Sequence, residues 1–220
     1  RVVALPFPKF FNLDQLDQTT QDRWRTTNIF TVDEKMDGSC GIVSCVNGHW
    51  QVTTRGSFSS TQAVWATEWL HHTKEGMAAR VKMHPDVTYI TEIISADNRI
   101  VIPYDFEGLV LLGGYHVPSL CEVSDAHLNT IPLRRPRRYM FFSIDDILAQ
   151  LPQLDRYEEG YVVRNTLGER VKLKGEAYVR LHGLVSDVTP LRVWELMVAN
   201  ADLEAVCREL PDEFQDDFKQ

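Results

Sequence analysis

The sequence has 220 residues, of which 44% are hydrophobic and 25% are charged, as in an ordinary globular protein. No apolar run approaches the roughly 18 to 20 residues of a membrane span, so we expect no membrane partner. The formal net charge of −8 argues against a protein that coats nucleic acid non-specifically. Residues 195–220 hold eight of the 31 acidic and two of the 23 basic residues, which leaves residues 1–194 at only −2. A local basic patch for phosphate groups is therefore compatible with the acidic total.

Strands dominate the prediction for the amino-terminal part of the chain. Short strands are expected at residues 2–5, 29–34, 41–46 and 50–54. Asn47-Gly48, between the last two, is the strongest signal for a two-residue hairpin turn. Ser59 and Ser60 can cap one long helix over residues 61–82. Its buried face would hold Ala63, Trp65, Ala66, Trp69 and Leu70.

The remainder of the chain continues this mixture and then becomes helical. Further strands are expected at residues 87–94, 99–102, 109–112 and 140–142. A helix over residues 144–151 precedes a second hairpin, with strands at 160–164 and 170–174. Helical spacing follows at residues 177–184 and 190–200, with Thr189-Pro190 as a helix start. We predict an α+β domain over residues 1–186 and the beginning of an incomplete α-helical domain over residues 187–220.

The cysteines indicate the cellular compartment of the protein, and the first residue indicates whether the sequence is a fragment. The four cysteines form no C-x-x-C pair and have no histidine at zinc-ligand spacing; they are Cys40, Cys45, Cys121 and Cys207. We interpret them as free thiols of a protein in the cytoplasm or another reducing compartment. The sequence begins with Arg1 and shows no signal peptide, so we expect it to be a fragment.

Lys35 is the first candidate for chemistry. It follows the predicted strand 29–34 and precedes the turn pair Asp37-Gly38. A free lysine has a pKa near 10.4, so well under about 0.1% is the neutral nucleophile at pH 7. Burial, neighbouring cations and a bound metal all favour the neutral amine. Lys172 and Lys174, two residues apart on one strand, would point to the same face and supply such cations.

Two carboxylates and two further cations accompany this lysine. Glu92 and Glu159 lie in apolar stretches, where a buried carboxylate has to be paired, hydrogen-bonded or bound to metal. Glu92 could accept a hydrogen bond from a ribose hydroxyl, and Glu159 could hold Mg²⁺ through water or pair with a lysine. Lys9 and Arg55, beside turns at strand exits, are candidate donors to the phosphates of a nucleotide.

Each of these residues has a simpler interpretation when it is taken alone. Lys35 would be a surface lysine, and Glu158-Glu159 and Lys172-x-Lys174 would be solvated strand positions. The run 134–138, with four arginines around Pro136, is as typical of a solvated loop as of an RNA-binding patch. His71-His72 is expected at the surface without a metal. The order of the pieces along the chain, rather than any one of them, favours covalent nucleotidyl transfer.

This order of motifs resembles the covalent nucleotidyltransferases, ligases and capping enzymes, and most of all the phage-type ATP-dependent RNA ligase 1 family. The resemblance covers residues 1 to about 200. Its segments are Pro6-Phe7-Pro8-Lys9-Phe10-Phe11-Asn12, Lys35-Met36-Asp37-Gly38-Ser39, Thr54-Arg55-Gly56-Ser57-Phe58, Glu92 with the stretch 98–104, Glu159-Gly160-Tyr161-Val162, Val171-Lys172-Leu173-Lys174 and Tyr178-Val179-Arg180-Leu181-His182.

The resemblance implies a fold and a set of catalytic residues. The fold would be two antiparallel β-sheets flanked by helices around a nucleotide cleft. Lys35 would be the residue that carries AMP, and Asp37 would assist the later steps. Glu159 would organise a metal ion through water or a lysine, and Lys172 and Lys174 would contact the α-phosphate.

The resemblance also implies the remaining ATP-binding residues. Glu92 would bind the ribose of AMP, and the carbonyl group of Glu34 would read the exocyclic amine of adenine. Lys9 and Arg55 would contact the outer phosphates or the incoming RNA end. Gly38 and Tyr178 complete the predicted ATP site.

From these residues and this resemblance we predict an ATP-dependent RNA ligase. It would use Mg²⁺, or Mn²⁺ in its place, and join RNA 5′-phosphate and 3′-hydroxyl ends through lysyl-AMP and adenylylated-RNA intermediates. RNA repair is the expected setting, with tRNA as a candidate substrate. Two alternatives stay open: another covalent nucleotidyltransferase, such as a GTP-dependent capping enzyme or a DNA ligase, and a catalytically silent RNA-end binding module.

Overall fold

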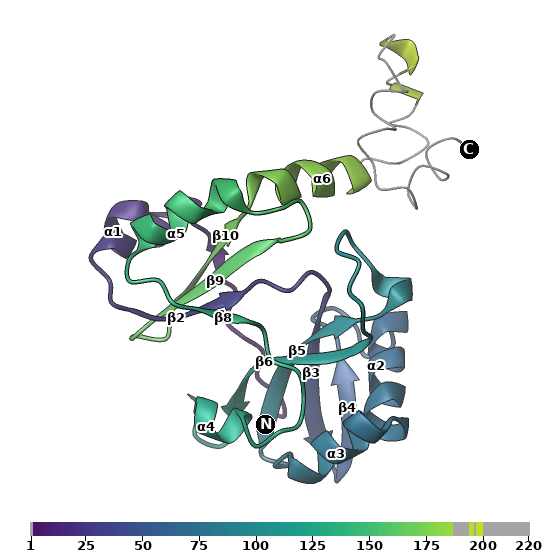
Figure 1. Ribbon diagram of the computed structural model, residues 1–220. Coiled ribbons are helices and arrows are strands. Elements are labelled where there is room, and N and C mark those ends of the chain that lie inside the picture. Colours follow the sequence, from purple (N-terminus) through teal and green to yellow (C-terminus); the bar gives the residue numbers. More distant parts are fainter. Residues whose placement is uncertain (1, 187–193, 196, 200–220) are drawn as a thin grey trace.

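Two five-stranded sheets, one above the other in Figure 1, form the computed structural model, which describes residues 2–186, 194, 195 and 197–199. Sheet A has the strand order β1-β10-β9-β2-β8. Its strands are β1 (Phe11–Asn12), β2 (Ile29–Glu34), β8 (Arg138–Tyr139), β9 (Gly160–Asn165) and β10 (Arg170–Lys174). Sheet B has the order β4-β3-β5-β6-β7. Its strands are β3 (Ser39–Val46), β4 (His49–Thr53), β5 (Val87–Ile94), β6 (Gly108–His116) and β7 (Cys121–Glu122).

Helices cover the outer faces of both sheets (Figure 1). The α-helices are α1 (Gln21–Arg25), α2 (Thr61–His72), α3 (Lys74–Lys82), α4 (Asp125–Leu128), α5 (Ile144–Gln150) and α6 (Glu176–Ser186). In the part of the chain that the structure describes, short 3-10 helices occupy Asp17–Thr19, Ala96–Asn98 and Leu151–Gln153. Within the described residues, no helix has the length and apolar character to span a bilayer.

Each sheet has its own hydrophobic core. In sheet A, Val32, Val163 and Val171 pack with Trp24 of α1 and Ile147 of α5, and all five are at most 2% exposed. In sheet B, the buried side chains of the central strands pack against α2 and α3; they include Val43, Tyr89, Ile93, Leu111, Leu70 and Ala79. Helices therefore cover one face of each sheet, and the other faces are available for a cleft.

The chain passes from one sheet to the other directly after β2. Strand β2 lies in sheet A and β3 lies in sheet B, so residues 35–38 form the link between them. Lys35 is thus placed where the two sheets meet.

Several predicted elements are confirmed. Strands β2 and β5 have the predicted bounds, and β3, β4, β6, α5 and both strands of the second hairpin are present. Asn47 and Gly48 have φ angles of 52° and 81°, as the expected two-residue hairpin turn requires. Cys40, Cys45 and Cys121 are free thiols, as predicted, while Cys207 lies outside the described residues.

Three predicted strands are wrong, because the backbone groups find other partners or none. Residues 2–5 form no strand, and the Leu5 N–H donates to the side chain of Thr88 rather than to a strand. In the expected strand 99–102, the N–H groups of Val101 and Ile102 donate to the Asp37 carboxylate. Strand β8 ends at Tyr139, and residues 140–142 continue beyond it without pairing to a strand.

The single helix predicted over residues 61–82 is two helices, α2 and α3. Thr73 interrupts it with an extended backbone (φ −87°, ψ 157°), and its side chain accepts a hydrogen bond from the Gly76 N–H. A side chain at Gly76 would overlap the Trp69 carbonyl oxygen, so this close approach needs glycine. The predicted buried face is confirmed for Ala63, Ala66 and Leu70, while Trp65 and Trp69 are partly buried against the core.

The predicted helix 177–184 is confirmed as part of α6, which ends at Ser186. The predicted domain over residues 187–220, including the helix start at Thr189-Pro190, lies outside the described residues apart from 194, 195 and 197–199. The boundary at residue 187 stays a prediction.

Replacing Gly160 by alanine should destabilise the fold far more than replacing Gly48. Both glycines have a positive φ, 136° and 81°, but only at Gly160 would a Cβ atom overlap a backbone atom, the Leu173 carbonyl oxygen. We expect Gly48→Ala to lower the free energy of unfolding by about 1 kcal/mol and Gly160→Ala by more than about 3 kcal/mol. Urea unfolding measures both, and equal losses would contradict the steric argument.

Candidate active site

Lys35 is held at the end of sheet A by its backbone and its side chain. The backbone N–H donates to the Gly160 carbonyl oxygen at 2.9 Å, which extends the pairing of β2 with β9 by one residue. The Nζ atom lies 2.8 Å from Oε1 of Glu159. The Lys35 side chain is 20% exposed and the Glu159 side chain only 3%, so the amine is accessible while its partner is not.

Glu159 also binds Lys174. The Lys174 Nζ atom lies 2.8 Å from the same Oε1 atom, so the two amines are no farther apart than twice this distance. A carboxylate buried to this degree is stable only when it is paired, and here two cations compensate for its lost hydration. The structure thereby brings together three of the five residues predicted to be catalytic.

Lys172 adds a third amine to this cluster. It pairs with Val162 in the sheet, and both side chains line the cavity beside Lys35. Burial lowers the pKa of Lys172, and the positive charges of Lys35 and Lys174 lower it further. Lys35 therefore lies near two other cations, as the sequence predicted.

Glu92 faces the link formed by residues 35–38 from sheet B. Its Oε1 atom accepts a hydrogen bond from the Gly38 N–H at 3.1 Å. Removal from water raises the pKa of Glu92 from its ordinary value of 4.5 to about 8. The charge of Glu159 acts in the same direction, while Lys35 opposes it. In the free protein, Glu92 is therefore largely a neutral acid at pH 7, able both to donate and to accept hydrogen bonds.

Asp37 is buried on the other side of the link, with its carboxylate fully engaged. Oδ2 accepts hydrogen bonds from the N–H groups of Val101 and Ile102, both at 2.9 Å. Oδ1 accepts one from the Tyr178 hydroxyl at 2.7 Å, and the Asp37 N–H donates to the Tyr104 hydroxyl oxygen. Burial and the nearby acids Glu159 and Asp37 raise the pKa of Tyr178, so its hydroxyl stays protonated and donates.

This network connects the segment beside the nucleophile to α6 and to the loop after β5. It gives Asp37 a positioning role, and its part in the later chemical steps stays a prediction. Tyr178 is 1% exposed, and its hydroxyl is committed to Asp37.

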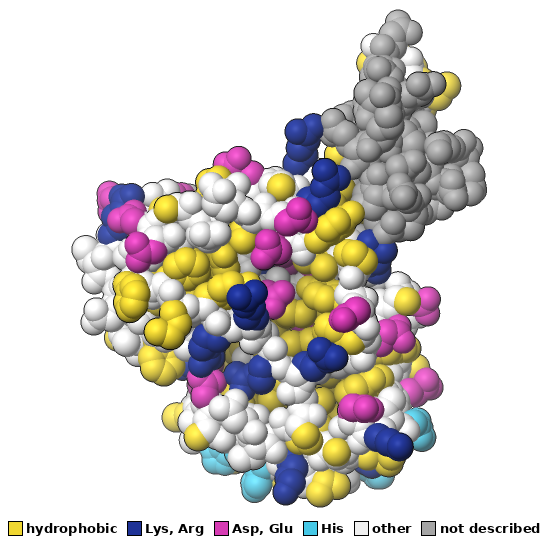
Figure 2. Space-filling view, viewed as in Figure 1, with side chains coloured by type: hydrophobic (Ala, Val, Ile, Leu, Met, Phe, Trp, Pro, Cys, Tyr) yellow, Lys and Arg dark blue, Asp and Glu magenta, His cyan; other side chains and the backbone are white. Residues whose placement is uncertain are grey.

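A cavity of about 320 Å³ lies between the two sheets beside these residues. Seven of the ten predicted ATP-binding residues line it: Lys9, Glu34, Lys35, Gly38, Arg55, Glu92 and Lys172. The other three do not; Lys174 and Tyr178 line a separate cavity next to α6, and Glu159 is enclosed between the lysines. Figure 2 shows acidic and basic side chains gathered along the boundary between the sheets.

Several residues of this cavity were missed by the sequence interpretation. They are Asp33, Glu122, Asp125, Arg164 and Arg170, whereas Arg135 and Arg138 were considered only as part of the basic run 134–138. Strand alternation could have found two of them, because Arg170 lies two residues before Lys172, and Arg164 lies two residues after Val162. Glu122 and Asp125 come from a two-residue strand and a four-residue helix that carry no motif.

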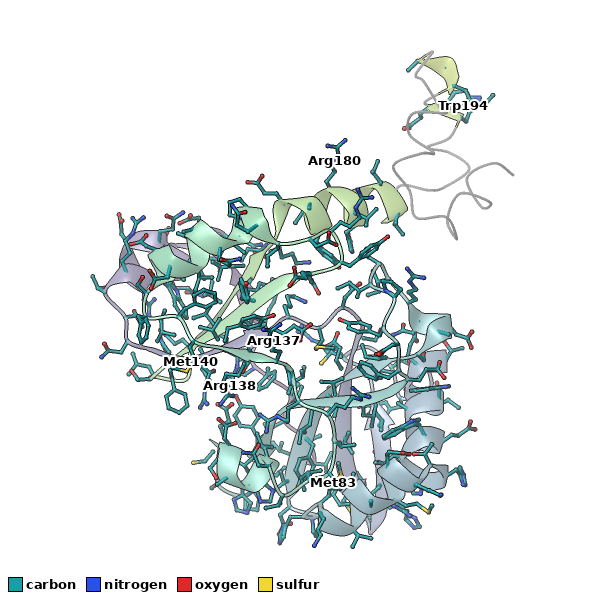
Figure 3. The ribbon with its side chains drawn as sticks, in the orientation of Figure 1. Met83, Arg137, Arg138, Met140, Arg180 and Trp194 are labelled. Atoms are coloured by element: carbon teal, nitrogen blue, oxygen red, sulfur yellow. The ribbon has the colours of Figure 1, made fainter. Side chains whose placement is uncertain are left out.

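The basic run 134–138 is tied to the protein by ion pairs. Arg135 pairs with Asp125 at 3.1 Å, and Arg138 pairs with Asp33 at 2.7 Å and with Asp125 at 2.8 Å. Arg137 and Arg138 lie at the junction of the two sheets in Figure 3. Part of this run is therefore a structural connection rather than a free basic patch or a solvated loop.

The donor set fits a magnesium ion that arrives with a nucleotide. Among the described residues, no group of three or more histidine, cysteine, aspartate or glutamate side chains could hold a metal by itself. Mg²⁺ usually binds through one or two carboxylates, water and substrate phosphates. Glu159 already binds two ammonium groups through Oε1, which agrees with contact through water rather than direct ligation.

Comparison with known proteins identifies relatives of the chain. A family model described as RNA ligase matches residues 1–178. A putative RNA ligase of Thermovibrio ammonificans is 28% identical over 195 residues, which cover 83% of this chain and 50% of that protein. A putative bifunctional polynucleotide kinase/RNA ligase of Autographa californica nuclear polyhedrosis virus is 27% identical, over 82% of this chain and 29% of the relative. The chain thus spans half or less of the length of these two relatives.

Solved structures share the fold. An archaeal ATP-dependent RNA ligase superimposes with a TM-score of 0.61 at 17% identity, over 83% of this chain and 50% of that chain. The Naegleria gruberi RNA ligase with PPi superimposes with a TM-score of 0.58 at 14% identity, over 83% of this chain and 60% of that chain. These similarities confirm the predicted fold class, the α+β nucleotidyltransferase fold with two sheets and flanking helices.

The raised pKa of Glu92 predicts a pH-dependent effect on stability. Because the folded pKa is about 8 and the ordinary value is 4.5, the unfolded chain loses this proton first as the pH rises. Glu92 therefore destabilises the fold progressively between about pH 4.5 and pH 8. Glu92→Gln should gain stability relative to wild type across this window and level off above it, as measured by urea unfolding. Glu68→Gln, exposed on α2, is the control. A difference in the free energy of unfolding between Glu92→Gln and wild type that does not change with pH would contradict the raised pKa.

Removing the hydrogen bond between Tyr178 and Asp37 should lower stability. Tyr178→Phe leaves a buried carboxylate oxygen with one partner fewer, and we expect a loss of about 1.5–3 kcal/mol in the free energy of unfolding. In a double-mutant cycle with Asp37→Asn, the two losses should be non-additive. Tyr157→Phe, at a side chain that is 38% exposed, should change stability by less than about 0.5 kcal/mol. Additive single losses would show that the two side chains are not coupled.

Proposed function

Because the chain belongs to the T4 RNA ligase 1 family, whose model matches residues 1–178, we propose that it is the adenylyltransferase part of an ATP-dependent RNA ligase. The observation that carries this proposal is the cluster of Lys35, Lys172 and Lys174 around the buried Glu159 at the edge of the inter-sheet cavity. Such a cluster can accept a phosphoryl group and stabilise its negative charge.

The first step is attack by the Lys35 amine on the α-phosphorus of ATP. A nitrogen–phosphorus bond forms, the bond to pyrophosphate breaks, and the amine loses its proton. Among the described acids, Glu159 is the one in ion-pair contact with Nζ, so it is the acceptor for the proton that the ammonium group gives up. Lys172 and Lys174 donate hydrogen bonds to the α-phosphate oxygens.

The later steps move AMP onto RNA and then seal the strand. The 5′-phosphate of an RNA displaces Lys35 from AMP, which forms a pyrophosphate linkage. A 3′-hydroxyl group then attacks the RNA phosphorus, a phosphodiester bond forms, and AMP leaves. Asp37 would keep the nucleophile loop in place during these transfers through its hydrogen bonds to Tyr178 and to the 101–102 backbone.

The remaining cavity residues would bind the nucleotide. Glu92, a neutral acid at pH 7, can exchange hydrogen bonds with the ribose hydroxyl groups. Lys9 and Arg55 can bind the outer phosphates or the RNA end. Mg²⁺, or Mn²⁺ in its place, would be held through water by Glu159 and would neutralise phosphate charge when bound.

RNA with 5′-phosphate and 3′-hydroxyl ends is the proposed substrate. The names of the relatives, RNA ligase and polynucleotide kinase/RNA ligase, support end joining in RNA repair. We include tRNA among the candidate substrates. Free thiols at Cys40, Cys45 and Cys121 support a reducing compartment, such as the cytoplasm, as the site of action.

Labelling with α-³²P-ATP tests the nucleophile. The wild-type chain, incubated with ATP and Mg²⁺, should acquire a label that is labile to acid and stable to base, as a phosphoramidate is. Lys35→Ala should acquire none, because its replacement has no amine to attack. Lys82→Ala, at an exposed position that ends α3, removes a lysine outside the cavity and should label as the wild type does.

Three outcomes would contradict the proposal. Equal label on Lys35→Ala would exclude this lysine, and stronger label from GTP than from ATP would favour a capping enzyme. On the full-length protein, sealing of single-stranded RNA should exceed sealing of nicked DNA. Binding of ATP and RNA without any label would identify a silent binding module instead.

A further inference from the structure

The cavity between the sheets has two ends of different charge. The first end holds four cations, Lys9, Lys35, Arg55 and Lys172, against the acids Glu34 and Glu92. The second end holds four arginines, Arg135, Arg138, Arg164 and Arg170, against the acids Asp33, Glu122 and Asp125. Because Glu92 is largely neutral at pH 7 and Glu159 is shared between Lys35 and Lys174, the first end keeps a net positive charge, whereas ion pairs nearly balance the second.

The two ends are separated along the central strands of sheet A. Lys35 contacts the backbone of Gly160, and Arg164 lies four residues further along β9. At about 3.3 Å per residue this is roughly 13 Å, a span that a nucleoside monophosphate can cover. Apolar side chains also line the cavity, among them Leu112 and Val162 from opposite sheets. A nearly neutral region with apolar walls and many donors and acceptors suits a nucleobase better than a phosphate.

Arg164, like Arg135 at the same end, has a guanidinium group that is only partly paired. Its Nη2 atom binds Oε2 of Glu122 at 2.9 Å, but Arg170 binds the other carboxylate oxygen of Glu122. The Arg164 Nε atom is buried and has no hydrogen-bond partner. An unpaired buried donor is destabilising, and Arg170 already neutralises Glu122. The ion pair with Glu122 therefore does not account for Arg164.

The backbone nevertheless holds Arg164 in place. Ile29 and Thr31 pair with the consecutive residues Asn165 and Arg164, so Phe30 is the extra residue of a β-bulge. Its ring stacks against the Arg164 guanidinium at 5.1 Å, although 57% of the Phe30 surface is exposed. Bulges re-aim side chains beside active sites, and here the result is a guanidinium oriented by an exposed ring.

We propose that Arg164 is a specificity-determining residue that donates a hydrogen bond to a ring nitrogen of the adenine of bound ATP. This inference rests on the proposed function and adds to it the side chain that reads the base. With the phosphates at the lysine end, the base lies at the arginine end. Phe30 is a positioning residue that acts through Arg164, and Glu122 holds the guanidinium from the side.

ATP analogues that lack one ring nitrogen test the contact. The second-order rate constant of self-adenylylation is measured with ATP and with 1-deaza-, 3-deaza- and 7-deaza-ATP, for the wild type and for Arg164→Met. For the wild type, this rate constant should be about tenfold or more lower with one analogue than with ATP, which is the effect of one hydrogen bond from a charged donor. For Arg164→Met, the rate constant with ATP itself should fall by a similar factor relative to wild type. The variant should no longer distinguish that analogue from ATP. The loss should appear in the apparent KM for ATP, with the rate at saturation retained.

Further variants separate this role from a structural one. Arg25→Ala removes an arginine of α1 that pairs with Asp22 of α1 and Asp145 of α5, outside the residues that line the cavity, and should keep the wild-type discrimination. Phe30→Ala should weaken discrimination, and Phe30→Tyr, which retains the ring, should restore it. Equal discrimination in wild type and Arg164→Met would overturn the inference while leaving the proposed function intact. A wild type that takes no label from any nucleotide would overturn both.

Discussion

The buried carboxylate of Glu159 is the constraint on which the candidate site depends. A charge this far from water is destabilising unless cations surround it, and Lys35 and Lys174 lie at equal distances from the same oxygen. The three residues belong to the ends of β2 and β10 and to the residue before β9, which are the adjacent central strands of sheet A. The pairing register of these strands therefore sets the geometry of the nucleophile, and a slip by one residue would turn the lysines to the opposite face.

Asp37 fulfils the corresponding role on the far side of the nucleophile loop. Its carboxylate replaces strand pairing for Val101 and Ile102 and anchors α6 through Tyr178. Lys35 thus lies between two buried acids with different partners, one surrounded by ammonium groups and the other by neutral donors. The acid that contacts the amine can exchange protons with it, whereas the acid that is enclosed by hydrogen bonds fixes the backbone. The carboxylates of Glu159 and Asp37, on either side of Lys35, thereby have different functions.

The sequence predicted what local rules determine. Alternation along a strand placed Lys172 and Lys174 together, and the Asn47-Gly48 turn and the bounds of β2 and β5 follow from residue type and periodicity. The prediction failed where a distant side chain overrides the local preference. At residues 99–102, which have β-forming side chains, the backbone N–H groups of Val101 and Ile102 donate to Asp37 instead of to a neighbouring strand. Arg164, Arg170 and Glu122 were missed for the same reason: their significance arises when β7 of one sheet meets β9 and β10 of the other, a contact that no local pattern encodes.

The uneven charge of the cavity has a consequence for how a nucleotide enters. Both sheets contribute to each end, but cations outnumber charged acids near Lys35, and the arginines at the other end are largely engaged by Asp33, Glu122 and Asp125. A triphosphate carries about four negative charges, so the electrostatic free energy favours one orientation strongly over its reverse. In the low-dielectric space between the sheets this preference is greater than it would be in water. With Lys35 as the proposed nucleophile, this charge distribution would align the α-phosphate with it before any contact with the base is made, and contacts at the arginine end would be left to discriminate among bases.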